Sequence, residues 1–361
     1  MKLPVLPLYL CLSLILHQTY SQDFVLTRYR HLEGTDNNKD TISLDLCTHK
    51  GSIWGYYFCS YPEKPVRISG TLDSTGQFRI SSENRPGEEF NGTWSASQFT
   101  GTGKTENGNK KSSFRLYDDA GEKYVKMELI CSDTCYHIHD SLPDNVATVS
   151  QSLLIPYTST SSSGLKRIIM TEYFEPEIIN EDTAISELLN LTAGQFITGY
   201  RQTFLESGMD VPESWTYEIR MSAVYNSVAV ISLEISKYTY SGGAHGNMHI
   251  GYINYDNQNE RRLTPKDIFS EAAEERLTGL ITEQIRMQFD ADTNASLADF
   301  GFNKEEIEPA ENFYLSDKGI GFVYNSYEIA PYSMGVFNIF LPMEMITDLL
   351  KEDFMLSLKR E

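Results

Sequence analysis

The sequence predicts an α+β protein, in which an N-terminal antiparallel β-meander domain is followed by an α+β domain with helices packed on an antiparallel sheet. Between about residues 41 and 117, short β-like segments recur at intervals of roughly ten residues and are separated by glycine-bearing turns. Beyond about residue 150, some segments carry apolar residues at helical intervals and others are typical of strands. Helices beside antiparallel-looking strands define the α+β class rather than a doubly wound sheet.

The meander begins at Thr41–Leu46, where polar and apolar side chains alternate as they do in a strand with one buried face. Turns such as Ser69-Gly70 and Ser74-Thr75-Gly76 interrupt the pattern. The later segments expected to form strands lie at residues 53–58, 66–68, 77–80, 89–94, 99–101 and 114–116.

The second part of the chain mixes the two periodicities. Thr264-Pro265-Lys266-Asp267 is typical of a helix start, because the threonine side chain can cap the helix, proline suits the first helical position and an acid suits the third. The run Ser159–Gly164 predicts a loop between two strands. Helices are expected at residues 179–205, 272–289 and 344–350, and strands at 217–221, 228–233, 319–324 and 336–340.

The N-terminus has the features of a cleavable secretion signal. Lys2 supplies the positive charge, Leu3–Leu16 is apolar, and the small residues before Gln22 fit cleavage near Ser21. No later stretch is apolar enough to predict a membrane span. We therefore expect a signal peptide at residues 1–21, a β-rich domain at 22–147 and an α+β domain at 148–361, and a periplasmic or secreted protein.

Export changes how the cysteines are interpreted. Of the five cysteines, Cys11 lies in the expected signal, which leaves Cys47, Cys59, Cys131 and Cys135. An even number in an oxidising compartment predicts disulfides, and three pairings are possible. The local pairs Cys47–Cys59 and Cys131–Cys135 are favoured. The spacing of Cys131 and Cys135 to the histidines that follow is not a standard zinc spacing, so we expect no metal.

The negative charge is concentrated in the second domain. Residues 22–147 contain 14 basic and 18 acidic residues, a net charge of −4, whereas residues 148–361 contain 15 basic and 32 acidic residues, a net charge of −17. This distribution disfavours nucleic acids and anionic lipids as partners, because both attract positive surfaces. It favours encounter with a cationic partner, although acidity also serves solubility alone.

Two local sequences stand out as candidate contact segments. Tyr240-Ser241-Gly242-Gly243-Ala244-His245-Gly246 combines aromatic residues with glycines that permit positive φ, and is expected to be a tight turn entering a strand. The stretch Tyr324–Gly335 contains Tyr327, Pro331 and Tyr332. Tyrosine anchors many interfaces, because it offers a large contact area with few rotatable bonds. The alternative is a loop folded over its own domain.

The meander offers a different candidate surface. Trp54, Tyr56, Tyr57 and Trp94 are aromatic residues on its expected strands. Gathered on one exposed face, they would form a stacking surface for cell-wall glycan, and such binding would persist at high salt. A hydrolase with His245 as general base is a third alternative, but no partner residue for it is identifiable. The sequence indicates no cofactor.

Four motifs in order resemble a known domain. They are Tyr240–Gly246, Leu263–Phe269, Phe313–Phe322 and Tyr327–Gly335, and together they resemble the RsiV-like domain, over roughly residues 150–355. That domain ends the extracytoplasmic part of RsiV-type anti-sigma factors and also occurs in PdaC-type peptidoglycan deacetylases. The resemblance implies a receptor for lysozyme, a cationic protein, with the turn Ser241–His245 and the loop Ala330–Tyr332 as candidate contacts. We expect a non-catalytic envelope protein that binds such a partner through Tyr240, Ser241, His245, Tyr327, Pro331 and Tyr332. The N-terminal meander loosely resembles a module of exported proteins.

Overall fold

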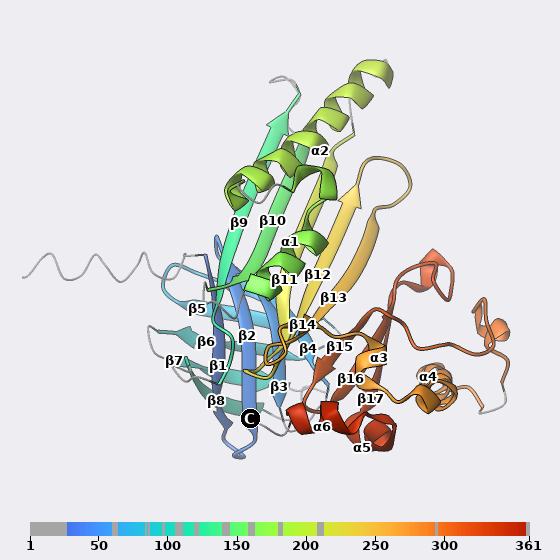
Figure 1. The fold of residues 1–361 in the computed structure, drawn as a ribbon. Helices are drawn as coiled ribbons and strands as arrows, with labels where there is room; N and C mark the ends of the chain where they lie inside the picture. The colour runs from blue at the N-terminus through green and yellow to red at the C-terminus, as the bar shows by residue number, and fades with distance from the viewer. Residues whose placement is uncertain are drawn as a thin grey trace, which may run out of the picture.

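The fold consists of a closed β-barrel, a six-stranded sheet covered by helices and a three-stranded sheet with its own helices (Figure 1). The structure, a computed structural model, describes residues 27–59, 64–83, 85, 87–95, 98–104, 111–118, 123–138, 145–157, 163–179, 183–207, 213–292 and 295–358. The expected signal peptide at residues 1–21, with its cleavage point, lies outside this part of the chain. The α+β class predicted from the sequence is confirmed.

The β-meander closes on itself, because its last strand pairs antiparallel with its first. Each strand otherwise pairs with the next along the chain. The strands are β1 (Arg28–Asp36), β2 (Thr41–His49), β3 (Ser52–Cys59), β4 (Val66–Leu72), β5 (Gln77–Ser82), β6 (Glu89–Trp94), β7 (Gln98–Lys104) and β8 (Lys111–Asp118). Closure removes the exposed edges that an open meander would present to other chains.

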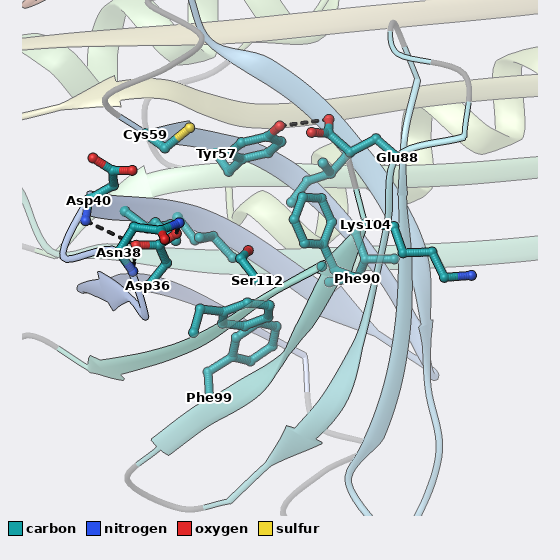
Figure 2. Close-up of a pocket in the computed structure, with 16 residues that line it drawn as sticks. Asp36, Asn38, Asp40, Tyr57, Cys59, Glu88, Phe90, Phe99, Lys104 and Ser112 are labelled. Carbon is teal, nitrogen blue, oxygen red and sulfur yellow. Dashed lines mark hydrogen bonds between the residues drawn. The ribbon is translucent and has the colours of Figure 1, made fainter. Parts of the chain in front are cut away.

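The barrel interior is filled unevenly. Phe78 and Phe99 stack with their ring centroids 4.0 Å apart, and Trp94 packs edge-on against Phe99 at 5.3 Å. A cavity of about 360 Å³ remains at the other end (Figure 2), where the side chain of Tyr57 donates a hydrogen bond to Glu88 at 2.6 Å. The barrel therefore has one packed end and one hollow end.

The second layer is a sheet in the order β14-β13-β12-β11-β10-β9. Its strands are β9 (Met127–His137), β10 (Val146–Pro156), β11 (Trp215–Asn226), β12 (Val230–Tyr240), β13 (Asn247–Asp256) and β14 (Arg261–Arg262). All neighbours are antiparallel except β10 and β11, which are parallel. Strand β9 lies before the domain boundary expected between residues 147 and 148, yet it belongs to this sheet.

Two helices make the crossover that a parallel strand pair needs. They are α1 (Ser163–Tyr173) and α2 (Ile185–Ser207), and both contact β10. The expectation of a simple loop between two strands around Ser159–Gly164 is wrong, because α1 begins at Ser163; residues 158–162 lie outside the described part. The predicted helix at residues 179–205 is confirmed as α2.

The third layer is the sheet β15 (Phe313–Ser316), β16 (Gly319–Tyr324) and β17 (Phe337–Pro342). Its helices are α3 (Pro265–Ile268), α4 (Glu274–Gln288), α5 (Met343–Ile346) and α6 (Glu352–Leu358). The capping motif predicted at Thr264 is present, since the Asp267 carboxylate accepts hydrogen bonds from the Thr264 backbone N–H at 2.8 Å and hydroxyl at 2.6 Å. The apolar faces of α3, α4 and α5 form one core with this sheet.

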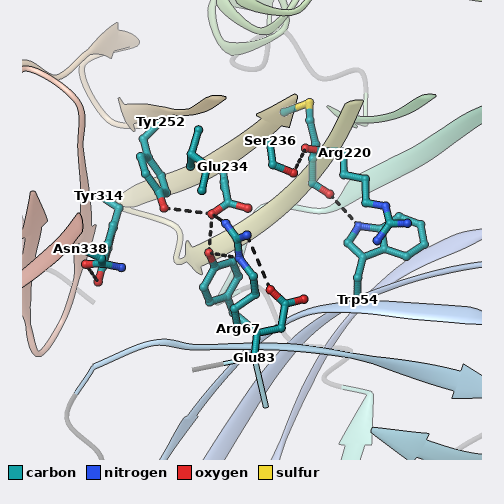
Figure 3. A network of polar contacts seen from close by, with 12 residues as sticks. Trp54, Arg67, Glu83, Arg220, Glu234, Ser236, Tyr252, Tyr314 and Asn338 are labelled. Atoms are coloured by element: carbon teal, nitrogen blue, oxygen red, sulfur yellow. Dashed lines mark hydrogen bonds and ion pairs between the residues drawn. The ribbon is translucent and has the colours of Figure 1, made fainter. Parts of the chain in front are cut away.

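The barrel contacts the six-stranded sheet mainly through β2 and β3, and Figure 3 shows a polar network at this contact. The carboxylate of Glu234, on β12, is 2% exposed and accepts hydrogen bonds from Tyr56 at 2.5 Å and Tyr252 at 2.9 Å. Arg67, from β4 of the barrel, forms an ion pair with the same carboxylate. Beside this network, the indole N–H of Trp54 donates to the backbone oxygen of Met221 at 3.0 Å.

A second buried polar cluster lies on the same side of the barrel. Asp45 is 3% exposed, accepts a hydrogen bond from Tyr29 and lies 2.9 Å from Nδ1 of His31. Asn226, on β11, donates to the Tyr29 hydroxyl at 2.8 Å. Tyr124 stacks on the imidazole with ring centroids 4.6 Å apart. These two polar clusters flank an apolar contact. Hydrogen bonds as well as apolar packing therefore determine how the barrel is placed on the sheet.

Replacing Glu234 by alanine should lower the free energy of unfolding by about 3–5 kcal/mol, because the buried Tyr56 and Tyr252 hydroxyls would lose their acceptor and Arg67 would keep only its 3.7 Å ion pair with Glu83. Urea denaturation monitored by tryptophan fluorescence measures this change. The double variant Arg67→Met, Glu234→Met should recover part of the loss, since it leaves no buried unpaired charge but still removes the acceptor of Tyr56 and Tyr252. Asp348→Ala, which breaks an exposed ion pair with Arg276, is the matched control and should have a much smaller effect. If Glu234→Ala lowers the free energy of unfolding no more than Asp348→Ala does, the buried Glu234 network does not stabilise the fold.

Stability should also depend on pH through His31. Burial lowers the pKa of this imidazole, but the Asp45 and Glu33 carboxylates outweigh burial and raise it to about 10. Because the folded pKa is the higher one, the contribution is fully present below about pH 6.5 and is lost as the pH rises toward 10. The stability difference between the wild type and His31→Gln should therefore shrink over that interval in urea titrations. A difference that stays constant would show that the imidazole is not charged in the folded protein.

Candidate functional site

The two segments singled out in the sequence lie against each other in the structure. The rings of His245 and Tyr332 stack with their centroids 3.8 Å apart and an interplanar angle of 16°. The Tyr332 hydroxyl donates a hydrogen bond to the backbone oxygen of Gly246 at 2.6 Å. We call the surface formed by Tyr240, Ser241, His245, Tyr327, Pro331 and Tyr332 the aromatic turn–loop site.

The turn connects β12 to β13 and is shaped by its glycines. Gly242 and Gly243 have φ values of 90° and 92°, which side-chain-bearing residues rarely adopt. Glu213 holds the turn from outside, because its carboxylate accepts hydrogen bonds from the Gly243 N–H at 3.2 Å and the Tyr240 hydroxyl at 3.3 Å. Gly246 lies so close to Tyr238 that a Cβ there would come within 2.4 Å of the phenol oxygen. The glycines of the turn, together with Glu213, thus determine its backbone conformation.

The loop after β16 is fixed to β13. The side chain of Asn325 accepts a hydrogen bond from the Ile250 N–H at 2.8 Å and donates to the Ile250 carbonyl at 3.1 Å. Tyr327 adopts a φ of 74°, and its N–H donates to the Ala330 carbonyl at 3.1 Å. A tyrosine at positive φ is uncommon and persists only where the surrounding contacts determine it. The loop is therefore a structured element.

The site presents aromatic rings to solvent. Tyr327 is 63% exposed, and its ring centroid lies 5.6 Å from that of Tyr332. Ser241, His245 and Pro331 are also exposed, and Tyr332 is half-buried. The alternative was a loop folded over its own domain. The Tyr332 hydroxyl fits this alternative, because it is hydrogen-bonded within the domain, but the exposed Tyr327 ring does not.

His245 has a structural contact that accounts for its position. Its Nδ1 lies 3.0 Å from the Gly246 carbonyl, in addition to the stacking with Tyr332. Within the described part of the chain, no group of three or more His, Cys, Asp or Glu side chains is arranged to hold a metal ion. His245 is thus an exposed ring held by the Gly246 carbonyl and by Tyr332.

The aromatic residues proposed as a glycan surface are buried, so this interpretation is wrong. Trp54, Tyr56, Tyr57 and Trp94 are only 5–7% exposed. Successive side chains of a strand point to opposite faces, so Trp54 and Tyr56 pack on the six-stranded sheet while Tyr57 points into the barrel. Trp94 belongs to the barrel core. These four rings form no common surface.

The favoured disulfides are also wrong, since all four cysteines are free. Cys59 pairs in register with Ile42, whereas Cys47 lies five residues further along β2. At about 3.3 Å per residue the two Cα atoms are roughly 16 Å apart, and a disulfide requires less than about 7 Å. Cys131 and Cys135 are both in the extended strand β9, roughly 13 Å apart by the same spacing. The pairings were predicted from the short separation of the cysteines in the sequence. In extended strands, that short separation still corresponds to a large distance.

The sequence did not reveal the barrel cavity. Glu88 is 6% exposed, follows a turn rather than a strand pattern, and meets Tyr57 only because the barrel closes. A buried acidic residue next to short strands carries no recognisable motif. Only the alternation of large apolar residues along the meander indicates an enclosed interior.

The comparisons with known proteins match the second part of the chain. Residues 155–248 match the family described as deacetylase PdaC, and residues 266–344 match the family described as protein of unknown function DUF3298. The aromatic turn–loop site draws its turn from the first segment and its loop from the second. No curated protein sequence matches this chain. These matches support the PdaC-related part of the resemblance, and the RsiV-type branch remains a prediction.

Two solved structures resemble this fold. A DUF3298 family member from Bacteroides fragilis has a TM-score of 0.58 and 24% identity, over 66% of this chain and 98% of its own. A DUF3298 family protein from Pseudomonas aeruginosa has a TM-score of 0.46 and 19% identity, over 64% of this chain and 96% of its own. The first likeness establishes a shared fold. None of the helices in the described residues combines the length and apolar character needed to span a bilayer.

The cysteines should differ sharply in reactivity. Burial raises the pKa of Cys131 to about 12 and raises that of the Cys47 thiol well above its usual range, whereas Cys135 is exposed. Since the thiolate is the reactive form, an alkylating reagent should label Cys135 first and Cys47 only on unfolding. Peptide mapping by mass spectrometry without reductant measures this order, and Cys135→Ser is the control. Recovery of disulfide-linked Cys47–Cys59 or Cys131–Cys135 peptides would contradict the structure.

Proposed function

We propose that this is an exported, non-catalytic binding protein that captures a cationic protein through the aromatic turn–loop site, with lysozyme as the specific candidate. The observation that carries the proposal is the stacking of His245 on Tyr332 beside the exposed ring of Tyr327. Two segments more than 80 residues apart in the chain converge on this surface. Their aromatic groups do not fill a core, so a surface role accounts for them best.

The site is organised before any partner arrives. Tyr327 is held at positive φ by the hydrogen bond to Ala330, and Tyr332 is anchored by its hydroxyl to Gly246. Binding through rigid aromatic groups avoids much of the entropy cost of ordering side chains at an interface. Such anchors commonly supply most of the binding energy of an interface.

The charge supports a cationic partner. Residues 148–361 carry 15 basic and 32 acidic residues, and the carboxylates of Glu213 and Glu328 belong to the contacts that shape the site. An acidic surface accelerates the encounter with a basic protein and disfavours acidic competitors. The resemblance to RsiV-type domains points to lysozyme as such a partner, and the secretion signal predicted at the N-terminus supports an encounter outside the cytoplasm.

Replacing Tyr327 by asparagine should weaken binding to a c-type lysozyme by about 1–3 kcal/mol, because it removes an anchoring ring. Asparagine tolerates the positive φ of this position, so the loop should keep its shape. Tyr332→Ala should have an effect of similar size. Isothermal titration calorimetry at low and at moderate salt measures the affinities.

Tyr117→Ala is the matched control, because Tyr117 is a 45% exposed tyrosine on the barrel, outside the site. It should leave lysozyme affinity unchanged. Unchanged affinity in both Tyr327→Asn and Tyr332→Ala would exclude the site. Wild-type binding that disappears at moderate salt would reduce the interaction to non-specific charge attraction and would exclude lysozyme as the specific partner.

A further inference from the structure

The hollow end of the barrel is a second candidate binding site, of a size that fits a small molecule. The connections after β1 and β5 lie at this end together with the strand ends at Cys59 and Lys104, and residues from each of them line the cavity. The opposite end is filled by Trp94 and the stacked Phe78 and Phe99. The cavity is therefore a blind pocket that opens in one direction.

The walls of the pocket are apolar. They are formed mainly by Ile42, Leu44, Ile68, Ile80, Phe90, Phe99 and Phe114. The interior of a folded domain normally leaves few voids larger than a water molecule. A hollow of about 360 Å³ falls within the range of small-molecule sites. The pocket thus has the size and lining to hold an apolar body of moderate length.

One carboxylate is built into this apolar wall. Glu88 is 6% exposed, and its Oε2 accepts the hydrogen bond from the Tyr57 hydroxyl. Its Oε1 lies 3.9 Å from the Arg85 guanidinium, a distance beyond hydrogen bonding. Since a carboxylate accepts about four hydrogen bonds, Glu88 keeps capacity for a further donor. A buried charge with unused acceptor capacity favours a cation or a strong donor beside it.

The rim of the pocket reinforces that preference. Asp36 and Asp40 lie on one side of the pocket, and Lys104 extends away from it (Figure 2). The oxygens of Asp36 are occupied by Asn38 and by the Asp40 backbone, so its charge acts on the pocket entrance rather than through a direct bond. Asp36, Asp40 and Glu88 outnumber Lys104 and the Arg85 guanidinium beside Glu88, so an anionic head group would be repelled.

We propose that the barrel binds a small amphiphile whose apolar tail lies among the phenylalanine rings and whose protonated amine contacts the Glu88 carboxylate. None of the residues of the aromatic turn–loop site lines this pocket. The barrel site is therefore independent of the proposed capture of a cationic protein. An experiment can exclude one of these two proposals and leave the other standing.

The test is calorimetric titration of the purified protein with three probes of equal chain length, namely decylamine, decanol and decanoate, each below its micelle concentration at neutral pH. Decylamine should bind saturably with one site, and decanoate should bind at least about tenfold more weakly, because it would bring a second carboxylate to Glu88. Equal binding of all three probes, or binding of none, would overturn the proposal.

Two variants separate the roles of the carboxylate and the cavity. Glu88→Gln keeps the size of the side chain and should reduce decylamine affinity about tenfold, to the level of decanol, while decanol binding stays the same. Ile42→Trp fills the pocket near its rim and should abolish binding of both probes, with an unchanged circular dichroism spectrum as the check on folding. Tyr332→Ala is the matched control and should bind decylamine like the wild type. Decylamine binding that survives Ile42→Trp would place the probe elsewhere and overturn the assignment.

Discussion

The burial of one carboxylate between two β-structures organises this molecule. Glu234 projects from the six-stranded sheet and is bound by Tyr56 and Arg67 of the barrel and by Tyr252 of its own sheet. Removing an ion from water is costly unless each of its acceptor sites finds a donor. The geometry that satisfies Glu234 is available only when β3 and β4 lie on β12 in this register. The contact therefore contributes specificity of docking, while Trp54 and Cys47 belong to one apolar core with residues of the sheet.

The same strands lead from this contact to the aromatic turn–loop site. β12 continues from Glu234 to Tyr240, where the turn begins, and β13 returns past Ile250, which Asn325 binds through both its backbone groups. Asn312 makes equivalent bonds to the backbone of the same strand. The turn and the loop thus rest on one rigid strand pair. A partner that contacts Tyr327 would meet a surface whose position is already fixed by the sheet.

The sequence predicted what depends on local chemistry. The helix start at Thr264, the long helix α2 and the alternating strands of the meander follow from capping and periodicity, and they appear where expected. Helix α1 was missed because its short segment follows a serine-rich run that is typical of a loop. Closure of the meander and the parallel pairing of β10 with β11 depend on contacts between distant segments, which no local pattern records. The two motifs of the aromatic turn–loop site were found separately, but their contact through His245 and Tyr332 required the fold.

The errors about aromatic residues and about cysteines have different causes. The run Ile53–Phe58 is apolar without interruption, which is typical of a strand covered on both faces, whereas the meander around it alternates. Weighing that contrast would have placed Trp54 and Tyr56 against a second layer and Tyr57 inside the barrel. Cys47 lies far from Cys59 for another reason, because both are in extended strands whose register separates them by five residues. Once β3 is a central rather than an exposed strand, the aromatic surface available to a large partner moves to the loop of Tyr327. The barrel is then left with an interior suited only to small molecules.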